Sequence, residues 1–238
     1  MEAETRSEES FMSQSPARPT ALVTGASRGI GEAIARALAD THHVLVGGRD
    51  EAAVAAVVAS LPSAEPWVCE LTGELAPLPE RLDVLVHSAG LEAFGTVEET
   101  AREEWVRLFD VNVFAVAELT RQALPALRAA RGLVVAINSG AGLTAGAGFS
   151  AYAGSKFALR ALTDALREEE RGNGVRVSSV HPGRVDTAMQ ERLTEAYGRE
   201  YDAGRHLAPE DIAAAVRTVV EMPERGTIES VSVRPTQK

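Results

Sequence analysis

A tyrosine and a lysine lie four residues apart in the segment Y-A-G-S-K, which runs from Tyr152 to Lys156. If this segment is helical, positions i and i+4 share one face and the phenol lies beside the ammonium. A neighbouring positive charge favours the ionised form of a phenol, so such a pair can take part in proton transfer. The same spacing also occurs on solvated helix faces, and the pair alone does not separate the two interpretations.

Two further polar residues are candidates to join this pair. Ser139 ends an apolar segment, and a loop rich in glycine and small residues joins it to Tyr152, so the hydroxyl can fold back beside the phenol. Asn112 lies in the apolar segment L-F-D-V-N-V-F-A-V, where a buried amide needs hydrogen-bonding partners. The alternative for Asn112 is a core asparagine satisfied by the backbone.

The segment T-G-A-S-R-G-I-G, from Thr24 to Gly31, follows an apolar segment and opens a helix-period segment. Its glycines allow the backbone to approach a pyrophosphate, and the helix amino terminus offers free N–H groups. The strand before it and the helix after it favour nucleotide binding over a structural turn. A nucleoside-triphosphatase loop would need Lys-Ser or Lys-Thr after its last glycine, whereas Glu32 follows Gly31. ATP is therefore disfavoured.

The second apolar segment ends in G-G-R-D, which places Arg49 where dinucleotide-binding folds usually have an acid for the adenosine ribose. A guanidinium at this position matches a 2′-phosphate in bidentate fashion, and Arg28 can add a second positive charge. We therefore expect NADP(H) to be preferred. Asp50 follows directly and keeps NAD(H) open, because a small backbone shift could exchange it for Arg49.

Short apolar segments alternate with helix-period segments along the chain. We expect strands at 21–25, 43–48, 66–71, 82–90, 132–139, 175–183 and 228–235, and helices near 29–40, 50–60, 100–130, 150–171 and 209–221. This order predicts an α/β fold: one Rossmann-like, doubly wound domain over 18–238, with a mostly parallel seven-stranded sheet flanked by helices. Ligands bind such sheets outside the carboxyl ends of the strands. Two prolines within 72–81 predict a stunted helix between the third and fourth strands.

The composition excludes several classes of function. The net charge of −10 argues against a nucleic-acid or anionic-membrane surface, and no apolar segment approaches the roughly 20 residues of a membrane span. The single cysteine, Cys69, has no partner for a disulfide or a metal site, which fits a cytoplasmic protein without a metal. Residues 1–17 are polar and acidic, and we predict that they form a disordered tail.

Together with H-S-A-G at 87–90 and H-P-G-R-V-D-T at 181–187, these motifs resemble the short-chain dehydrogenase/reductases, in their compact single-domain ("classical") branch, over about residues 19–235. The resemblance implies an NADP(H)-dependent oxidoreductase that interconverts a carbonyl (ketone or aldehyde) and an alcohol by hydride transfer. It also implies a small-molecule substrate, and a homodimer or homotetramer formed through the helices that carry Asn112 and Tyr152. The alternative is a non-catalytic NADP-binding regulatory protein on the same fold.

The resemblance also implies residue roles. Tyr152 would be the general acid/base, Lys156 would stabilise the tyrosinate and bind the nicotinamide ribose, Ser139 would bind the substrate oxygen, and Asn112 would hold a relay water. The implied cofactor-binding residues are Gly25, Ser27, Arg28, Gly29, Ile30, Gly31, Arg49, Glu70, Leu71, Ser88, Ala89, Gly90, Tyr152, Lys156, Pro182, Gly183, Val185 and Thr187.

The chain departs from the family pattern at several points. Ser88 replaces the usual asparagine, which puts the support of the central strands in question, and Glu70 replaces the usual aspartate near the adenine amino group. The segment 189–207, expected to form the substrate lid, is short and polar, and we expect it to cover a large apolar ligand poorly. His181 and Asp186 flank the cofactor motif and are further candidates to touch the substrate.

Overall fold

The computed structural model describes residues 18–196, 198 and 200–236, and the predicted tail lies outside them. Its centre is one seven-stranded sheet in the order β3-β2-β1-β4-β5-β6-β7, and every pair of neighbouring strands is parallel. The strands are β1 (Thr20–Val23), β2 (His43–Gly48), β3 (Ala64–Val68), β4 (Val84–His87), β5 (Leu133–Ile137), β6 (Arg176–Pro182) and β7 (Ser230–Val233). The predicted α/β doubly wound fold is confirmed, and its switch point lies between β1 and β4.

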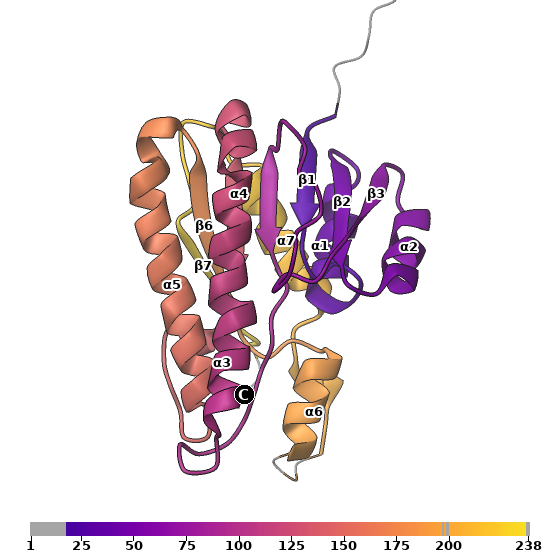
Figure 1. The fold of residues 1–238 in the computed structure, drawn as a ribbon. Coiled ribbons are helices and arrows are strands. Elements are labelled where there is room, and N and C mark those ends of the chain that lie inside the picture. Colours follow the sequence, from indigo (N-terminus) through magenta and orange to yellow (C-terminus); the bar gives the residue numbers. More distant parts are fainter. Residues whose placement is uncertain (1–17, 197, 199, 237–238) are drawn as a thin grey trace, which may run out of the picture.

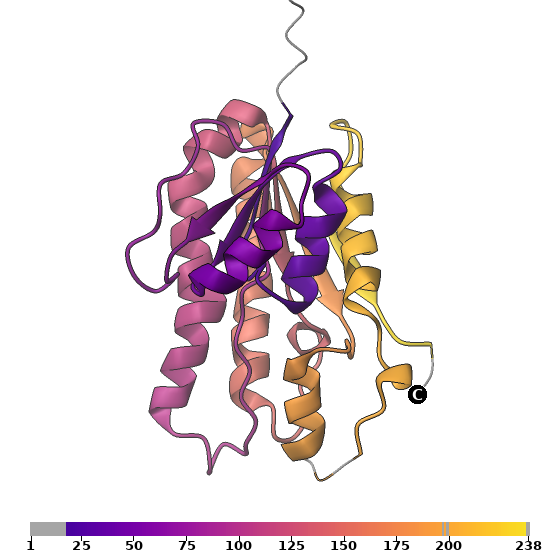
Figure 2. The same ribbon diagram turned by 90° about the vertical axis from the view of Figure 1, so that its right-hand side faces the viewer.

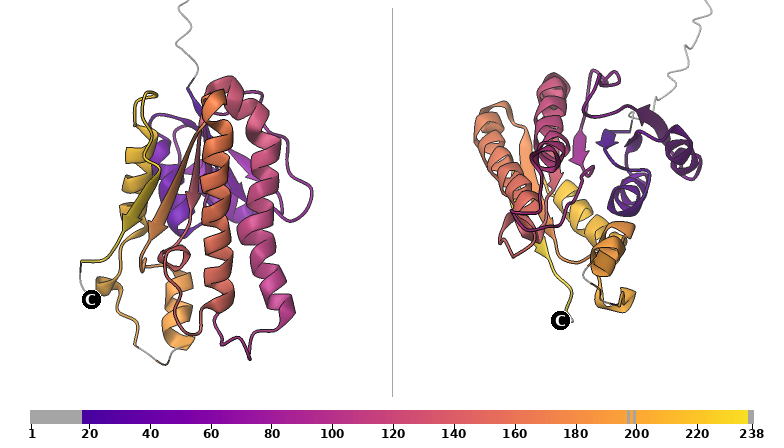
Figure 3. Two further views of the ribbon diagram at one scale, coloured as in Figure 1. Left: turned by 90° about the vertical axis from the view of Figure 1, so that its left-hand side faces the viewer. Right: turned by 60° about the horizontal axis from the view of Figure 1, so that its bottom comes forward.

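Helices cover both faces of the sheet (Figure 1). They are α1 (Gly29–Leu38), α2 (Glu51–Ala59), α3 (Arg102–Phe109), α4 (Ala115–Ala130), α5 (Ser150–Glu170), α6 (Ala188–Ala196) and α7 (Pro209–Val220). Figure 2 shows α1, α2 and α7 on one face, and both panels of Figure 3 show α4 and α5 side by side on the other. The helix α6 lies beyond the carboxyl ends of the strands (Figure 1).

Alternation along each strand builds a core on either side of the sheet. In β1, Val23 packs into the cluster under α1 and α7, whereas its neighbour Leu22 packs into the cluster under α4. In β4, Val86 packs into the cluster under α1 and α7, and Leu85 packs into the cluster under α4. Because both faces of the sheet are covered, the central strand β5 is aliphatic and buried at every position, and each buried Val, Leu or Ile side chain contributes about 1.5–3 kcal/mol.

The connection from β3 to β4 differs from a usual crossover. Residues 69–83, all of which the structure describes, contain no helix, so the predicted stunted helix is absent altogether. Instead the indole Nε1 of Trp67 donates a hydrogen bond to the carbonyl oxygen of Pro77 at 3.0 Å, while Leu75 and Leu78 pack against the cluster under α4. Pro77 and Pro79 disfavour a helix in this segment, and a non-helical segment covers this part of the core instead.

The long helix predicted over 100–130 is interrupted. A π-helical turn, Asp110–Phe114, separates α3 from α4 and contains the buried Asn112. π-helical turns are frequent at functional sites because they redirect the residues within them.

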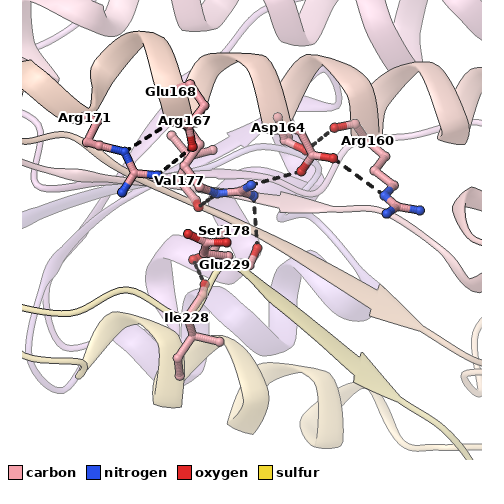
Figure 4. A network of polar contacts seen from close by, with 10 residues as sticks. Arg160, Asp164, Arg167, Glu168, Arg171, Val177, Ser178, Ile228 and Glu229 are labelled. Atoms are coloured by element: carbon pink, nitrogen blue, oxygen red, sulfur yellow. Dashed lines mark hydrogen bonds and ion pairs between the residues drawn. The ribbon is translucent and has the colours of Figure 1, made fainter.

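Arg167 ties α5 to the far edge of the sheet (Figure 4). Its guanidinium is only 9% exposed; Nε donates to the carbonyl oxygen of Val177 in β6 at 3.0 Å, and Nη2 donates to that of Glu229 at 3.1 Å. Asp164 accepts a third hydrogen bond from Nη1 at 3.0 Å. The helix α5 is therefore fixed against β6 and the segment that enters β7. Among the described helices, none is both long and apolar enough to cross a membrane.

Candidate active site

A cavity of about 730 Å³ lies where β4, β5 and β6 end. Ser139, Tyr152 and Lys156 line it, and so do residues of the H-S-A-G and H-P-G-R-V-D-T motifs. Three of the four residues predicted to carry out chemistry therefore share one cavity. The fourth, Asn112, is buried behind it.

Lys156 is anchored to the sheet. Its Nζ atom donates a hydrogen bond to the carbonyl oxygen of Ile137 in β5 at 3.2 Å, and it lies 5.9 Å from the centroid of the Tyr152 ring. The residue is only 5% exposed, and this burial lowers the pKa of its ammonium to about 8. Lys156 is therefore still protonated at pH 7.

Tyr152 lies in the first turn of α5 with its phenol in the cavity. Burial raises the pKa of the phenol to about 12, a hydrogen bond with the Ser139 side chain lowers it, and the charge of Glu92 raises it. The phenol is therefore protonated at neutral pH. A protonated phenol beside an ammonium can donate a proton and then keep the resulting tyrosinate near a positive charge.

Ser139 follows β5 in an extended conformation and is held by its own loop. Its N–H donates to Oδ1 of Asn138 at 2.9 Å, and its Oγ accepts from the N–H of Ala141 at 3.1 Å. Asn138 also donates to the carbonyl oxygen of Lys156 at 3.2 Å and so connects Ser139 with α5. A Cβ at Gly142 would lie 2.3 Å from Asn138 Oδ1, so only glycine fits there. Asn138 was not among the predicted site residues, although a polar residue directly after an aliphatic strand was a signal for it.

The side chain of Asn112 links the loop after β4 with α5. Oδ1 accepts from the N–H of Leu91 at 2.8 Å, and Nδ2 donates to the carbonyl oxygen of Leu91 at 2.9 Å and to Oγ of Ser155 at 3.0 Å. These contacts match the core-asparagine alternative. A relay water at Asn112 would have to use the remaining lone pair of Oδ1 or the main chain, and that role stays a prediction.

The glycine loop packs tightly against the H-S-A-G segment. Gly25 has φ of 63°, and a Cβ there would lie 2.8 Å from the Cα of Ala89. Thr24 supports the same contact, because its Oγ1 accepts from the N–H groups of Ser88 at 3.1 Å and Ala89 at 3.2 Å. Thr24 thus holds this loop to β1 even though Ser88 replaces the usual asparagine.

The glycine loop also meets the second motif. Gly29 has φ of 57°, and a Cβ there would lie 3.7 Å from Cγ2 of Thr187. The start of α1 and the start of α6 are therefore adjacent. This contact joins a helix amino terminus suited to phosphates with the part of the cavity that contains Tyr152.

Arg49, Asp50 and Glu70 lie where β2 and β3 end. Oδ1 of Asp50 accepts from the N–H of Ala53 at 3.1 Å and caps α2, so this carboxylate is already engaged. Arg49 is 74% exposed, and its Nη1 lies 3.5 Å from Oε2 of Glu70. Leu71 packs against the core cluster under α4. The geometry favours Arg49 over Asp50 as the group that meets a ligand at this edge.

The predicted cofactor residues divide into two sets. Those that line the cavity are Ile30, Ser88, Gly90, Tyr152, Lys156, Pro182, Gly183, Val185 and Thr187. Those outside its lining are Gly25, Ser27, Arg28, Gly29, Gly31, Arg49, Glu70, Leu71 and Ala89, which belong to the glycine loop, the ends of β2 and β3, and the H-S-A-G segment. Ile30 of the glycine loop lines the cavity, and Gly29 beside it comes close to Thr187, so the second set adjoins the cavity at this loop.

The lid contains the helix α6, and the last residue of the lid, Leu207, lies beside the H-P-G-R-V-D-T motif. The N–H of Asp186 donates to the carbonyl oxygen of Leu207 at 2.7 Å, and the hydroxyl of Tyr201 donates to Oδ1 of Asp186 at 2.5 Å. Tyr201 also stacks on His206 with a centroid distance of 4.9 Å. Asp186, a candidate for substrate contact, is thus bound to the lid, and its partner Tyr201 was not predicted.

The substrate end of the cavity is less polar than the lid sequence indicated. Phe94 and Phe149 form an edge-to-face pair with centroids 5.1 Å apart, and both line the cavity. The polar residues of the lining include Thr144, Gln190 and Arg205. His181, the other candidate for substrate contact, is 1% exposed and is not part of the described lining. Within the described residues, no group of three His, Cys, Asp or Glu side chains could hold a metal ion.

The family model for short chain dehydrogenases matches residues 19–198. The chain belongs to this family. It is 32% identical to dehydrogenase/reductase SDR family member 11 of Bos taurus, over 92% of this chain and 96% of that protein. It is 34% identical to glycine betaine reductase ATRR of Emericella nidulans over 90% of this chain, but it spans only 18% of that protein.

A solved structure shows the same arrangement. A metagenomic short-chain oxidoreductase in complex with NADP is 32% identical, with a TM-score of 0.76 over 93% of this chain and 99% of that one. The names of the sequence relatives differ: one is a glycine betaine reductase and the other is a dehydrogenase/reductase.

Proposed function

We propose that the protein is an NADP(H)-dependent oxidoreductase that interconverts a small ketone or aldehyde and the corresponding alcohol, with Tyr152 as general acid/base. The observation that carries the proposal is the convergence of Ser139, Tyr152 and Lys156 on one cavity that is continuous with the glycine loop. A hydroxyl and a phenol side by side suit a carbonyl oxygen, because both can donate hydrogen bonds to it as negative charge develops.

The residues fit a dinucleotide. Gly25 and Gly29 bring the backbone close to where the pyrophosphate would lie, at the amino terminus of α1. Val185 and Thr187 would hold the carboxamide of the nicotinamide. The exposed guanidinium of Arg49 supports binding of a 2′-phosphate, as does the NADP in the related metagenomic oxidoreductase. A bound NADPH would supply the hydride.

The chain's own residues would act on the carbonyl oxygen. Ser139 and Tyr152 would hydrogen-bond to it, and Tyr152 would transfer its phenolic proton as the hydride reaches the carbonyl carbon. One hydride and one proton convert the carbonyl to an alcohol and leave a tyrosinate, which the Lys156 ammonium would stabilise. In the reverse direction the tyrosinate would accept the proton from the alcohol.

We also infer a homo-oligomer formed through α3, the π-helical turn and α5. Val106, Phe114 and Phe157 are exposed on these elements at 46%, 57% and 41%. Apolar side chains gathered on neighbouring helices indicate an interaction surface, and a second copy of the chain is the partner that the family implies. Sedimentation at micromolar concentration should show a dimer or tetramer, and a monomer would contradict this inference.

The test of the function is a substrate panel. NADPH or NADH is mixed with aldehydes, ketones and diketones of increasing size, and absorbance of the reduced cofactor is followed. We expect turnover of at least one small carbonyl, with NADPH preferred to NADH. Binding of NADPH without turnover of any carbonyl or oxidation of any alcohol in the panel would favour the regulatory protein instead.

A further inference from the structure

His181 is a buried histidine at the end of β6, directly before the Pro182–Gly183 pair. It is 1% exposed, and its Nδ1 lies 3.1 Å from the main-chain carbonyl oxygen of Ser139. A carbonyl oxygen can only accept a hydrogen bond, so Nδ1 must carry a proton and donate it. The imidazole of His181 therefore connects β6 with the residue that follows β5.

The histidine can make this contact as a neutral group. Burial lowers the pKa of His181 most strongly, the positive charges of Arg160 and Arg234 lower it further, and the hydrogen bond to Ser139 and the charge of Asp164 raise it. The neutral tautomer with its proton on Nδ1 satisfies the contact throughout the neutral pH range. No change of charge is needed for it to hold Ser139.

The other main-chain contacts of Ser139 come from its own loop. The N–H of Ser139 donates to Asn138 at 2.9 Å, and its carbonyl oxygen accepts from the N–H of Gly142 at 3.0 Å. Asn138 is tied to β6 and α5, because its N–H donates to the carbonyl oxygen of Val180 at 2.7 Å and its side chain donates to that of Lys156 at 3.2 Å. His181, also in β6, holds the Ser139 carbonyl oxygen directly from outside the loop, so it gives the loop a second external fixed point.

Arg234, in the segment after β7, holds His181 in turn. Its Nη1 donates to the carbonyl oxygen of His181 at 2.5 Å, and a Cβ at Gly140 would lie 3.2 Å from its Nη2. Arg234 thus lies against both His181 and the loop of Ser139. The carboxy-terminal segment, His181 and Ser139 form one connected series of contacts.

We propose that His181 is a positioning residue for Ser139: its Nδ1–H holds the Ser139 carbonyl and so orients the Ser139 hydroxyl toward the reacting oxygen. This inference rests on the proposed function, in which Ser139 binds that oxygen. His181 itself touches neither substrate nor cofactor. Because a displacement of about 1 Å in a reacting group can cost on the order of 100-fold in rate, a lost fixed point has a measurable effect.

The kinetic test compares three variants on a carbonyl that the panel identifies. We expect His181→Leu to lower kcat by about 10- to 100-fold with the Kd of NADPH within about twofold, because only positioning is lost. In His181→Asn the side-chain nitrogen replaces Nδ1, and kcat should return to within about fivefold of wild type. The matched control is His42→Leu, which removes another buried imidazole, bonded to Thr41 at 2.8 Å before β2. His42→Leu should lower the stability of the fold and leave kcat within about threefold of wild type.

A double mutant shows whether His181 acts through Ser139. In a Ser139→Ala background there is no hydroxyl to orient, so adding His181→Leu should lower kcat by less than about threefold further. A full multiplicative loss would overturn the proposal, and so would His181→Leu with wild-type kcat. If His181→Leu does not fold, the tautomer of His181 in the wild-type chain decides, because the contact with Ser139 requires the proton on Nδ1.

A spectroscopic measurement needs no turnover. Long-range ¹H–¹⁵N spectra of the imidazoles of the full chain at pH 7 distinguish the two neutral tautomers, and loss of one signal in His181→Asn assigns it among the 5 histidines. We expect His181 to be neutral with the proton on Nδ1. The Nε2–H tautomer would overturn the contact with Ser139 whether or not a substrate is found, so this result is separate from a failure of the proposed function.

Discussion

The ammonium of Lys156 is fixed to the sheet and not to the phenol: its Nζ donates to the Ile137 carbonyl at 3.2 Å and lies 5.9 Å from the centroid of the Tyr152 ring. In the proposed mechanism Lys156 would therefore act on Tyr152 through its charge, from a position set by β5. A charge held in this way would stabilise the tyrosinate without a rearrangement during the reaction.

The rate of carbonyl reduction should depend on pH through Lys156. Its pKa is lowered to about 8 whereas that of Tyr152 is raised to about 12, so both groups are protonated at pH 7 and Lys156 deprotonates first. We expect kcat/KM at saturating NADPH to be constant near pH 6–7 and to fall as the pH rises through about 8. Circular dichroism at each pH is the control, and an unchanged spectrum would show that the fall in kcat/KM does not come from unfolding. A decline that begins only near pH 10 would contradict the assignment to Lys156.

Replacing Lys156 should raise the stability of the fold and abolish activity. The folded-state pKa lies below the ordinary 10.5, so the buried ammonium destabilises the fold at pH 7 and this cost disappears as the pH rises from about 8 to 10.5. Lys156→Met should be more stable than wild type at pH 7 by about 1–3 kcal/mol, while turnover is lost. Urea unfolding at pH 7 and pH 10 measures the difference, which should shrink at the higher pH. A Lys156→Met variant that is less stable than wild type at pH 7 would contradict the prediction that the buried ammonium destabilises the fold.

The Arg49–Glu70 ion pair should limit the affinity for NADPH. Because Arg49 Nη1 lies 3.5 Å from Glu70 Oε2, a 2′-phosphate must compete with that carboxylate. We expect Glu70→Gln to bind NADPH a few-fold more tightly, and Arg49→Ala to bind it about 10- to 100-fold more weakly. Binding of NADH should change by less than about twofold in Arg49→Ala. Fluorescence titration of both cofactors gives these constants, and equal changes for NADH and NADPH would show that Arg49 does not read the 2′-phosphate.

Removing the Asn112 amide should destabilise the fold. Asn112→Ala leaves the Leu91 N–H and carbonyl groups without their side-chain partner and removes a donor to the Ser155 hydroxyl, and we expect a loss of about 2–4 kcal/mol. The control is Gln122→Ala, which removes an exposed amide bonded to the solvated carboxylate of Glu118, and there the change should stay within about 0.5 kcal/mol. Denaturant unfolding measures both. An Asn112→Ala variant with wild-type stability would show that the three hydrogen bonds contribute nothing net.

Sequence periodicity predicted the order of strands and helices because both faces of the sheet are covered. The aliphatic residues of β4 and β5 are buried at every position, and this produces a strong signal. The π-helical turn around Asn112 was not predictable in the same way. Neither Pro nor Gly occurs within Asp110–Phe114, and the hydrogen bond of Asn112 in this turn is with Leu91, 21 residues away in the sequence.

Chemistry-bearing residues with fixed spacing were easier to predict than those that support them. Tyr152 and Lys156 lie one helical turn apart, so the sequence itself brings them together. Asn138, Thr24 and Tyr201 act through partners that the fold alone brings near, and their residue types carry no distinctive pattern. The lid was expected to be polar, and the aromatic pair Phe94–Phe149, which also lines the cavity, comes from two loops that are distant in sequence.

The most direct measurement is the rate of NADPH oxidation by wild type and by Tyr152→Phe, with the best carbonyl of the panel and saturating cofactor. The substitution removes only the phenolic oxygen. A general acid contributes about 100- to 10,000-fold, so we expect kcat to fall by at least about 100-fold while the Kd of NADPH stays within about threefold. Turnover by Tyr152→Phe within about threefold of wild type would contradict the assignment of Tyr152 as the proton donor.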